Sequence, residues 1–292
     1  MIKIIKLTQA KDYRKSIENA ISKSQPYKSS QKGYKIVGGT EVTYNKYPWF
    51  AYLSIDTPSG SYMCGGSLMT DKYIITAAHC LEDATSVTVI LNTNTIKPLP
   101  STATIRHGIN IYINTNYNSQ NITNDIAIIE LDIRVQDIAP IILNVTSKSF
   151  TGKPFNIIGY GHTSFNGQSV YTYREAIVYG VDTSTCASTY RVSMTGKICA
   201  SVPQGGVDSC QGDSGGPLFD GNILYGLVSY GAGCGDKGIP GVYTDVSYQK
   251  DFITSVLNKT VVESPTKKLT IGEIIGIVAG VIGIFLLFFF FS

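Results

Sequence analysis

The stretch Asp208-Ser-Cys-Gln-Gly-Asp-Ser-Gly-Gly-Pro217 decides how this chain is interpreted. Within it, Ser214 stands among three glycines, two aspartates and a cysteine. A serine hydroxyl becomes an effective nucleophile only when a base removes its proton and hydrogen-bond donors stabilise the oxyanion that forms. Glycines let the backbone turn tightly and leave amide N–H groups open to a substrate carbonyl. The stretch therefore predicts a nucleophilic serine at position 214.

A nucleophilic serine needs a base, and the chain has only three histidines. His79 ends the apolar run Ile74-Ile-Thr-Ala-Ala-His-Cys80, whereas His107 and His162 stand in polar or turn-like sequence and are interpreted as structural. An acid must orient the base, and Asp125 enters the apolar run Asn124-Asp-Ile-Ala-Ile-Ile-Glu-Leu131. Asp125 alone is equally typical of a turn before a strand. The order His79, Asp125, Ser214 favours a catalytic triad.

Three motifs together resemble the trypsin/chymotrypsin family of serine proteases. They are Thr76-Ala-Ala-His-Cys80, Asn124-Asp-Ile-Ala127 and Gly212-Asp-Ser-Gly-Gly-Pro217. The order of histidine, aspartate and serine is that of this family and differs from subtilisins and α/β-hydrolases. The resemblance covers roughly residues 36 to 257 and is supported by Ile36-Val-Gly-Gly39, Pro48-Trp49, Cys64-Gly-Gly-Ser-Leu68, Cys199-Ala200, Ser229-Tyr-Gly231 and Pro240-Gly-Val-Tyr243.

The resemblance implies an all-β fold of two six-stranded antiparallel Greek-key β-barrels with a C-terminal α-helix. It implies a serine endopeptidase in which Ser214 attacks, His79 is the base, Asp125 orients it, and the amides of Gly212 and Ser214 form the oxyanion hole. It also implies a substrate-binding set with Asp208 at the floor of the primary pocket, and hence cleavage after Lys or Arg; the set is Asp208, Ser229, Gly231, Gly233 and Gly241. The alternative for Asp208 is a solvated loop aspartate. The chain departs from the family at Tyr160 and Tyr230, where many relatives carry tryptophan.

The segment Ile36-Val-Gly-Gly39 follows Lys35 and resembles the activation site of the family. The expectation is a zymogen with a pro-segment at residues 1–35, cut between Lys35 and Ile36, whose new α-ammonium group pairs with Asp213. Residues 1–35 contain no cysteine, so no disulfide would hold the released segment. The alternative is that Lys35-Ile36 is an ordinary entry into a strand.

Composition agrees with a globular β protein outside the nucleic-acid-binding classes. Apolar residues make up 43% of the chain, 29 residues are glycine, and the formal net charge is only +3. The charge is uneven, since residues 1–35 hold nine Lys and Arg against two acids, and the remainder holds fifteen against nineteen. The chain has the length of one protease domain, placed at residues 36–257, with additional segments.

Six cysteines are typical of an oxidising compartment, and they allow fifteen pairings. The resemblance implies Cys64–Cys80, Cys186–Cys199 and Cys210–Cys234. A zinc site is disfavoured because the sequence has no CxxC pair. Residues 81–106 carry only Glu82 and Asp83 as carboxylates, so the calcium loop of some relatives is not expected. No metal and no cofactor are predicted.

The C-terminal sequence changes character near residue 247. Ser247 is a candidate cap for a helix whose apolar face would carry Phe252, Ile253, Val256 and Leu257. A polar stalk is expected at residues 258–270 and a transmembrane helix at 271–292, because Ile274 to Phe291 is free of charge. The alternative is a cleaved signal for a lipid anchor.

The chain lacks a recognisable signal peptide, yet its cysteines and three sequons favour a membrane-anchored enzyme with its protease domain extracellular or in the secretory lumen. The sequons predict glycosylation at Asn121, Asn144 and Asn258. Expected partners are protein or peptide substrates, protein inhibitors and the membrane, but no nucleic acid. The alternative function is a catalytically inactive binding or adhesion module, which would be free to lose any member of the triad.

Overall fold

The computed structural model describes residues 1–7, 25–26, 39–146, 148–160, 171–209, 212–233 and 235–263. Its first barrel contains six antiparallel strands in the ring order β4-β5-β6-β9-β8-β7. Strands β4, β5 and β6 follow one another as hairpins and β7 returns to lie beside β4, which is a Greek-key connection. The strands are β4 (Phe50–Thr57), β5 (Gly60–Leu68), β6 (Tyr73–Thr76), β7 (Ser86–Leu91), β8 (Thr104–Asn114) and β9 (Ala127–Leu131).

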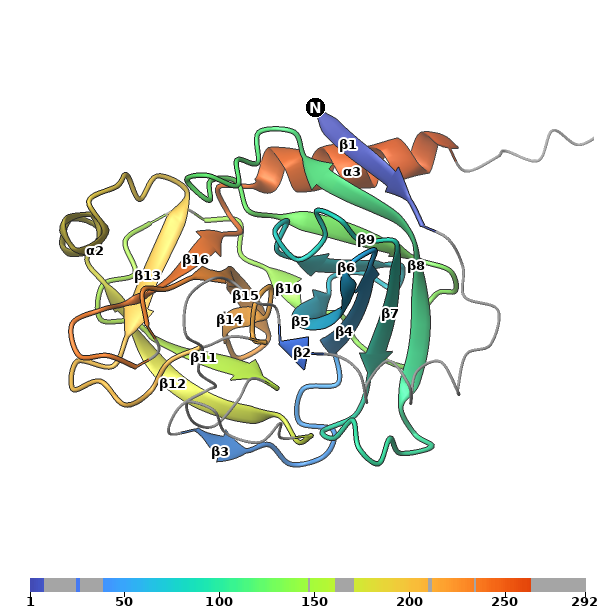
Figure 1. Cartoon of the computed structure of the whole chain (residues 1–292), viewed down its shortest axis with the longest axis horizontal. Helices are drawn as coiled ribbons and strands as arrows, with labels where there is room; N and C mark the ends of the chain where they lie inside the picture. Colours follow the sequence, from blue (N-terminus) through green and yellow to red (C-terminus); the bar gives the residue numbers. More distant parts are fainter. Residues whose placement is uncertain are drawn as a thin grey trace, which may run out of the picture. The chain divides into compact units, whose positions relative to one another are not determined.

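The second barrel repeats this topology in the ring order β11-β12-β13-β16-β15-β14. Figure 1 shows the two barrels, β4–β9 on the right and β11–β16 on the left. The prediction of two six-stranded antiparallel barrels is confirmed. The strands of the second barrel are β11 (Pro154–Gly159), β12 (Arg174–Val181), β13 (Lys197–Ser201), β14 (Pro217–Asp220), β15 (Ile223–Tyr230) and β16 (Gly241–Asp245).

Four short strands extend the two barrel sheets and were not expected from the sequence. β1 (Ile2–Lys6) pairs antiparallel with β8, and β2 (Gln25–Pro26) pairs parallel with β5. β3 (Thr40–Glu41) joins β12, and β10 (Ile142–Leu143) joins β15 in parallel. An added edge strand is held mainly by main-chain hydrogen bonds, so it needs no long apolar run. For this reason the polar sequence of residues 1–35 gave no signal for β1 or β2.

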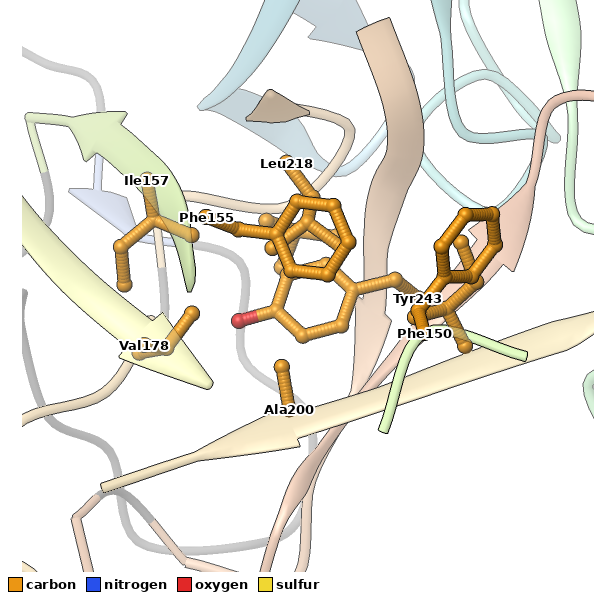
Figure 2. Packing of buried hydrophobic residues seen from close by; sticks show 9 residues of the cluster. Phe150, Phe155, Ile157, Val178, Ala200, Leu218 and Tyr243 are labelled. Carbon is orange, nitrogen blue, oxygen red and sulfur yellow. The ribbon is translucent and has the colours of Figure 1, made fainter. Parts of the chain in front are cut away.

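Buried apolar side chains fill both barrels. In the second barrel they gather around the fully buried Tyr243, as Figure 2 shows. Tyr160 is also buried; its ring stacks on Phe50 at 5.8 Å and meets Tyr52 and Tyr173 edge-on, both at 5.3 Å. Tyr160 therefore serves as a packing residue between the two barrels. The cluster around Tyr243 contains Phe150, Phe155, Ile157, Val178, Ile198, Ala200, Leu218 and Val228.

Two helices are present among the described residues. α2 (Thr183–Tyr190) was not predicted; it begins where the Asp182 carboxylate accepts hydrogen bonds from the amides of Ser184 and Thr185. α3 (Lys250–Glu263) is the expected C-terminal helix. The predicted cap was wrong, because the Ser247 hydroxyl donates to Asp245 at 2.7 Å and the helix begins three residues later.

α3 continues to Glu263 and so occupies part of the predicted stalk at residues 258–270. None of the helices within the described residues has the length and apolar character needed to cross a membrane. The segment 271–292, for which a transmembrane helix is predicted, lies outside the described residues.

Candidate active site

The pairing of β6 with β9 brings His79 and Asp125 to the same place. Thr76, the last residue of β6, pairs with Ala127, the first residue of β9. Because the two strands are antiparallel, the residues just after β6 and just before β9 leave the barrel at the same end. His79 and Asp125 are those residues, which explains how two motifs distant in sequence meet.

The Asp125 carboxylate holds His79 at two points. Asp125 Oδ2 lies 2.8 Å from His79 Nδ1, and Asp125 Oδ1 accepts the His79 backbone N–H at 2.9 Å. An ionised carboxylate only accepts hydrogen bonds, so Nδ1 carries the proton and Nε2 of the neutral ring is left as a base. Burial tends to lower the pKa of His79, but the charge of Asp125 and its hydrogen bond to the ring, with a smaller contribution from Glu82, together outweigh burial and raise this pKa above its ordinary value.

The fully buried Asp125 also receives hydrogen bonds from the second barrel. The Ser229 hydroxyl, on β15, donates to Asp125 Oδ2 at 2.6 Å, and the Thr244 hydroxyl, on β16, donates to the Asp125 backbone carbonyl at 2.9 Å. Burial tends to raise the pKa of Asp125, but its interactions with His79 and Ser229 hold it below the ordinary value. The side chain of Ser229, a predicted substrate-binding residue, faces Asp125.

The loop that carries Ser214 is fixed against the first barrel by its backbone. The Gly65 N–H, on β5, donates to the Ser214 carbonyl at 2.7 Å, and the Thr76 hydroxyl donates to the Gly65 carbonyl at 2.8 Å. A Cβ atom on Gly215 would lie 2.7 Å from the Gly65 carbonyl oxygen, so this close approach requires glycine at position 215. Ser214 is thereby held against β5 and β6, the strands that lead to His79.

Asp208, the predicted floor of the substrate pocket, is a buried carboxylate with a perturbed pKa. Its side chain accepts the amides of Ser209 at 2.8 Å and Gly235 at 3.2 Å. Burial raises the pKa of Asp208 to about 7, and these amide bonds only partly oppose the shift. The interpretation of Asp208 as a solvated loop residue is therefore wrong, since only 2% of this residue is exposed.

The glycines predicted beside Asp208 lie in close-packed backbone. A Cβ atom on Gly241 would be 2.9 Å from Asp208 Oδ1, and a Cβ atom on Gly231 would be 3.2 Å from the Gly233 carbonyl oxygen. Tyr190 of α2 was not predicted from the sequence; its hydroxyl donates to the Pro240 carbonyl at 2.6 Å and accepts the Ala232 N–H at 3.2 Å. Tyr190 thus ties together the two ends of the segment 231–241.

Lys197 is a second residue near the site that was not predicted from the sequence. It lies at the start of β13, opposite Thr244 of β16, and its ammonium group donates to the Tyr230 hydroxyl at 2.9 Å. Burial lowers the pKa of Lys197, and the Asp125 charge opposes the shift. No motif in the sequence marks this lysine, because its proximity to Asp125 depends on the pairing of β13 with β16.

Of the predicted activation residues Lys35, Ile36 and Asp213, only Asp213 lies in the described part of the chain. Asp213 is fully buried, and its carboxylate lies against Gly159, the last residue of β11. Lys35 and Ile36 lie outside the described residues, as does His162. His107 lies in β8, and its backbone N–H donates to Asp132 at 3.0 Å, which agrees with a structural role.

Two predicted disulfides are confirmed, Cys64–Cys80 and Cys186–Cys199. The third, Cys210–Cys234, involves residues outside the described part of the chain. Disulfides persist in oxidising compartments and are typical of an extracellular or secreted domain.

Within the described ranges, no group of three or more His, Cys, Asp or Glu side chains is placed to hold a metal ion.

The predicted glycosylation residues differ in exposure. Asn121 and Asn258 are exposed. Asn144 is buried, and its side-chain amide donates to the Thr146 carbonyl at 2.9 Å.

Comparisons with known proteins agree with this geometry. The family model described as Trypsin matches residues 36–253. The chain is 34% identical over 233 residues to a trypsin from Sus scrofa, covering 76% of this chain and 96% of that protein. It is 35% identical over 223 residues to brachyurin from Leptuca pugilator, covering 75% and 96%, and 31% identical over 226 residues to a trypsin from Saccharopolyspora erythraea, covering 76% and 98%.

The alternative of an inactive binding module gains no support from these matches. The family match spans both barrels and includes the hydrogen-bonded pair of His79 and Asp125 as well as the anchored loop of Ser214. The chain therefore belongs to the trypsin family and is a serine protease.

Proposed function

We propose that the enzyme is an endopeptidase in which Ser214 is the nucleophile, His79 the general base and acid, and Asp125 the group that orients His79. The observation that carries this proposal is the buried Asp125 carboxylate, which fixes the His79 ring from one side while Ser229 fixes the carboxylate from the other. In the first step Ser214 Oγ attacks the scissile carbonyl carbon as its proton passes to His79 Nε2.

The protonated His79 then gives its proton to the leaving amine, and an acyl group remains on Ser214. Water attacks this ester with His79 again as the base, which releases the carboxylic acid and restores the serine hydroxyl. The amides of Gly212 and Ser214 would donate to the oxyanion in both steps. Gly212 has a φ of +94°, a conformation that favours glycine and that aims its amide differently from an ordinary residue.

Cleavage after Lys or Arg is supported by the state of Asp208. Among the described residues, the buried Asp208 carboxylate accepts two amide hydrogen bonds, and its raised pKa indicates that its charged form is poorly stabilised. A substrate ammonium or guanidinium group would supply the missing opposite charge. Gly231, Gly233 and Gly241 would line the path of that long side chain, and the peptide backbone at Ser229 would pair with the substrate chain.

Activation would follow cleavage between Lys35 and Ile36, after which the α-ammonium group of Ile36 pairs with Asp213. The buried position of Asp213, directly before Ser214, supports this proposal. The new ion pair would set the Gly212 amide and the segment around Asp208 in their active positions. The enzyme would also cut after Lys35 itself, so one activated molecule could activate others.

The cellular setting proposed is a membrane-anchored enzyme whose protease domain is extracellular or lumenal. The uncharged run at 274–291 would be the anchor, as a transmembrane helix or as a cleaved lipid-anchor signal, and Asn121 and Asn258 would carry glycans. A glycan on Asn144 would have to displace its hydrogen bond to Thr146. Peptide substrates and protein inhibitors would be the partners.

A peptide panel tests the proposed activity. Activated wild-type enzyme and a Ser214→Ala variant are incubated with chromogenic peptides ending in Lys, Arg, Phe or Ala. We expect rapid hydrolysis after Lys and Arg by the wild type and a loss of several orders of magnitude in the variant. Hydrolysis after Phe as fast as after Arg would refute the specificity, and an active variant would refute the assignment of Ser214.

A further inference from the structure

Strand β1 covers an edge that the barrel itself leaves open. β8 is long, and its first part, Thr104 to His107, pairs with β7. Beyond that point one edge of β8 pairs with β9, and the opposite edge, from Asn110 to Asn114, pairs with β1. Figure 1 shows β1 running along this end of β8. Without β1 this edge would present unpaired N–H and C=O groups.

The hydrogen bonds at the two ends of β1 define which residues face β8. The Leu7 N–H donates to the Ile109 carbonyl at 3.0 Å, and the Thr115 N–H donates to the Met1 carbonyl at 3.4 Å. In an antiparallel pair every second residue directs its peptide groups to the partner. The peptide groups of Lys3 therefore face β8, like those of Met1 and Leu7, whereas the N–H of Lys6 points away from it.

Side-chain packing and charge add to this pairing. Leu7 lies over Gly108, where a Cβ atom would come within 2.9 Å of Leu7 Cδ1. Residues 1–35 hold nine basic against two acidic residues, and the rest of the chain holds fifteen against nineteen, so the two parts carry opposite net charge. Strand β2 gives the same segment a second attachment, with Gln25 opposite Tyr62 and Pro26 opposite Met63 of β5. Two attachments on one segment raise its effective concentration at each site.

We propose that the edge of β8 is a binding site for the pro-segment in its cleaved form, so that residues 1–35 stay with the protease domain after activation as a non-covalent second chain. The inference rests on the proposed cleavage between Lys35 and Ile36, which lies after both attachments. Since residues 1–35 contain no cysteine, strand pairing takes the place of a disulfide tether.

The test separates this binding from the activation mechanism. A Ser214→Ala variant of the full chain carries, after Ser30, an epitope tag followed by the recognition sequence of a site-specific protease. That protease cuts the inserted site, and gel filtration at physiological salt followed by denaturing gels measures how much tagged fragment stays with the domain. We expect the fragment to co-elute with the domain after cleavage.

Two matched proline variants identify the cause of retention. Lys3→Pro and Lys6→Pro both remove an exposed lysine, but only the first removes an N–H group that faces β8. We expect the fragment to be lost at least tenfold faster from Lys3→Pro than from Lys6→Pro, with Lys6→Pro close to the parent. Immediate loss from the parent, or equal loss from the two variants, would overturn the proposal.

N-terminal sequencing of the active wild-type enzyme tests the activation step independently. An uncut but active enzyme would overturn activation at Lys35 and would leave the retention result unaffected, because the retention experiment uses an inserted cleavage site.

Discussion

Gly159→Ala should disable the enzyme by displacing the carboxylate next to the nucleophile. Gly159 ends β11, and a Cβ atom there would overlap the Asp213 carboxylate: it would lie 2.5 Å from Asp213 Cγ and closer still to Oδ1, whereas real Cβ contacts do not fall below 3.0 Å. The φ of Gly159 is not in the left-handed region, so alanine would suffer no backbone strain. The predicted effect therefore comes from the overlap alone.

The Asp213 side chain is fully buried, so a rotation that relieves the overlap moves the carboxylate against packed neighbours. Its backbone is also fixed, since the Asp213 carbonyl accepts the Gly216 N–H at 2.8 Å and the next carbonyl, of Ser214, accepts the Gly65 N–H at 2.7 Å. Overpacking of this kind costs about 1–3 kcal/mol of unfolding free energy. A shift of about 1 Å at the nucleophile lowers the rate roughly 100-fold, so we expect kcat/KM to fall by about that factor.

The assay compares Gly159→Ala with Gly152→Ala. Gly152 has a φ of +75° and open space around its Cβ position, so alanine there costs roughly 1–2 kcal/mol of strain but contacts nothing. Hydrolysis of a chromogenic peptide gives kcat/KM, a serine-directed covalent reagent counts active sites, and calorimetry gives Tm. We expect both variants to lose stability and only Gly159→Ala to lose activity. Activity of Gly159→Ala within twofold of wild type would refute the reasoning.

Three further outcomes are expected. Asp208→Asn should lower kcat/KM for Arg substrates by a factor that corresponds to about 2–5 kcal/mol of transition-state binding. The control Asp236→Asn, at an exposed neighbour, should change kcat/KM little. Equal effects of Asp208→Asn on Arg and Ala substrates would contradict this prediction. On a plot of log(kcat/KM) against pH, the acid limb should approach a slope of about two for Arg substrates but about one for Ala substrates. For Arg substrates both Asp208, with its pKa raised to about 7, and His79, with its raised pKa, must lose a proton, whereas Ala substrates require this only of His79. A pH titration of the wild type with both substrates measures the slopes. Ser214→Ala should retain the wild-type Tm while losing turnover, as calorimetry and peptide hydrolysis would show.

Residues that lie in local motifs were predictable from the sequence. His79 and Asp125 stand at the ends of apolar strand sequences, and Ser214 stands among glycines whose close contacts with β5 the structure explains. The two barrels and two disulfides followed from the resemblance that these motifs carry. In each case the information is contained in a few adjacent residues.

Features that depend on strand register could not be predicted in the same way. The hydrogen bond from Ser229 to Asp125 joins residues 104 positions apart on different barrels. The proximity of Lys197 to Asp125 depends on the pairing of β13 with β16. β1 forms because β8 has an open edge, and that edge cannot be recognised in the sequence of residues 1–35.

The proposed catalytic groups are held by an exchange of hydrogen bonds between the barrels. Asp125 belongs to the first barrel but receives the hydroxyls of Ser229 and Thr244 from the second. Ser214 belongs to the second barrel, yet its carbonyl accepts the Gly65 N–H of the first. Neither barrel alone contains a complete set of partners for its own catalytic residue. Activity should therefore depend on how the barrels pack together, and the buried aromatic cluster around Tyr160, which includes residues of both barrel regions, contributes to that packing.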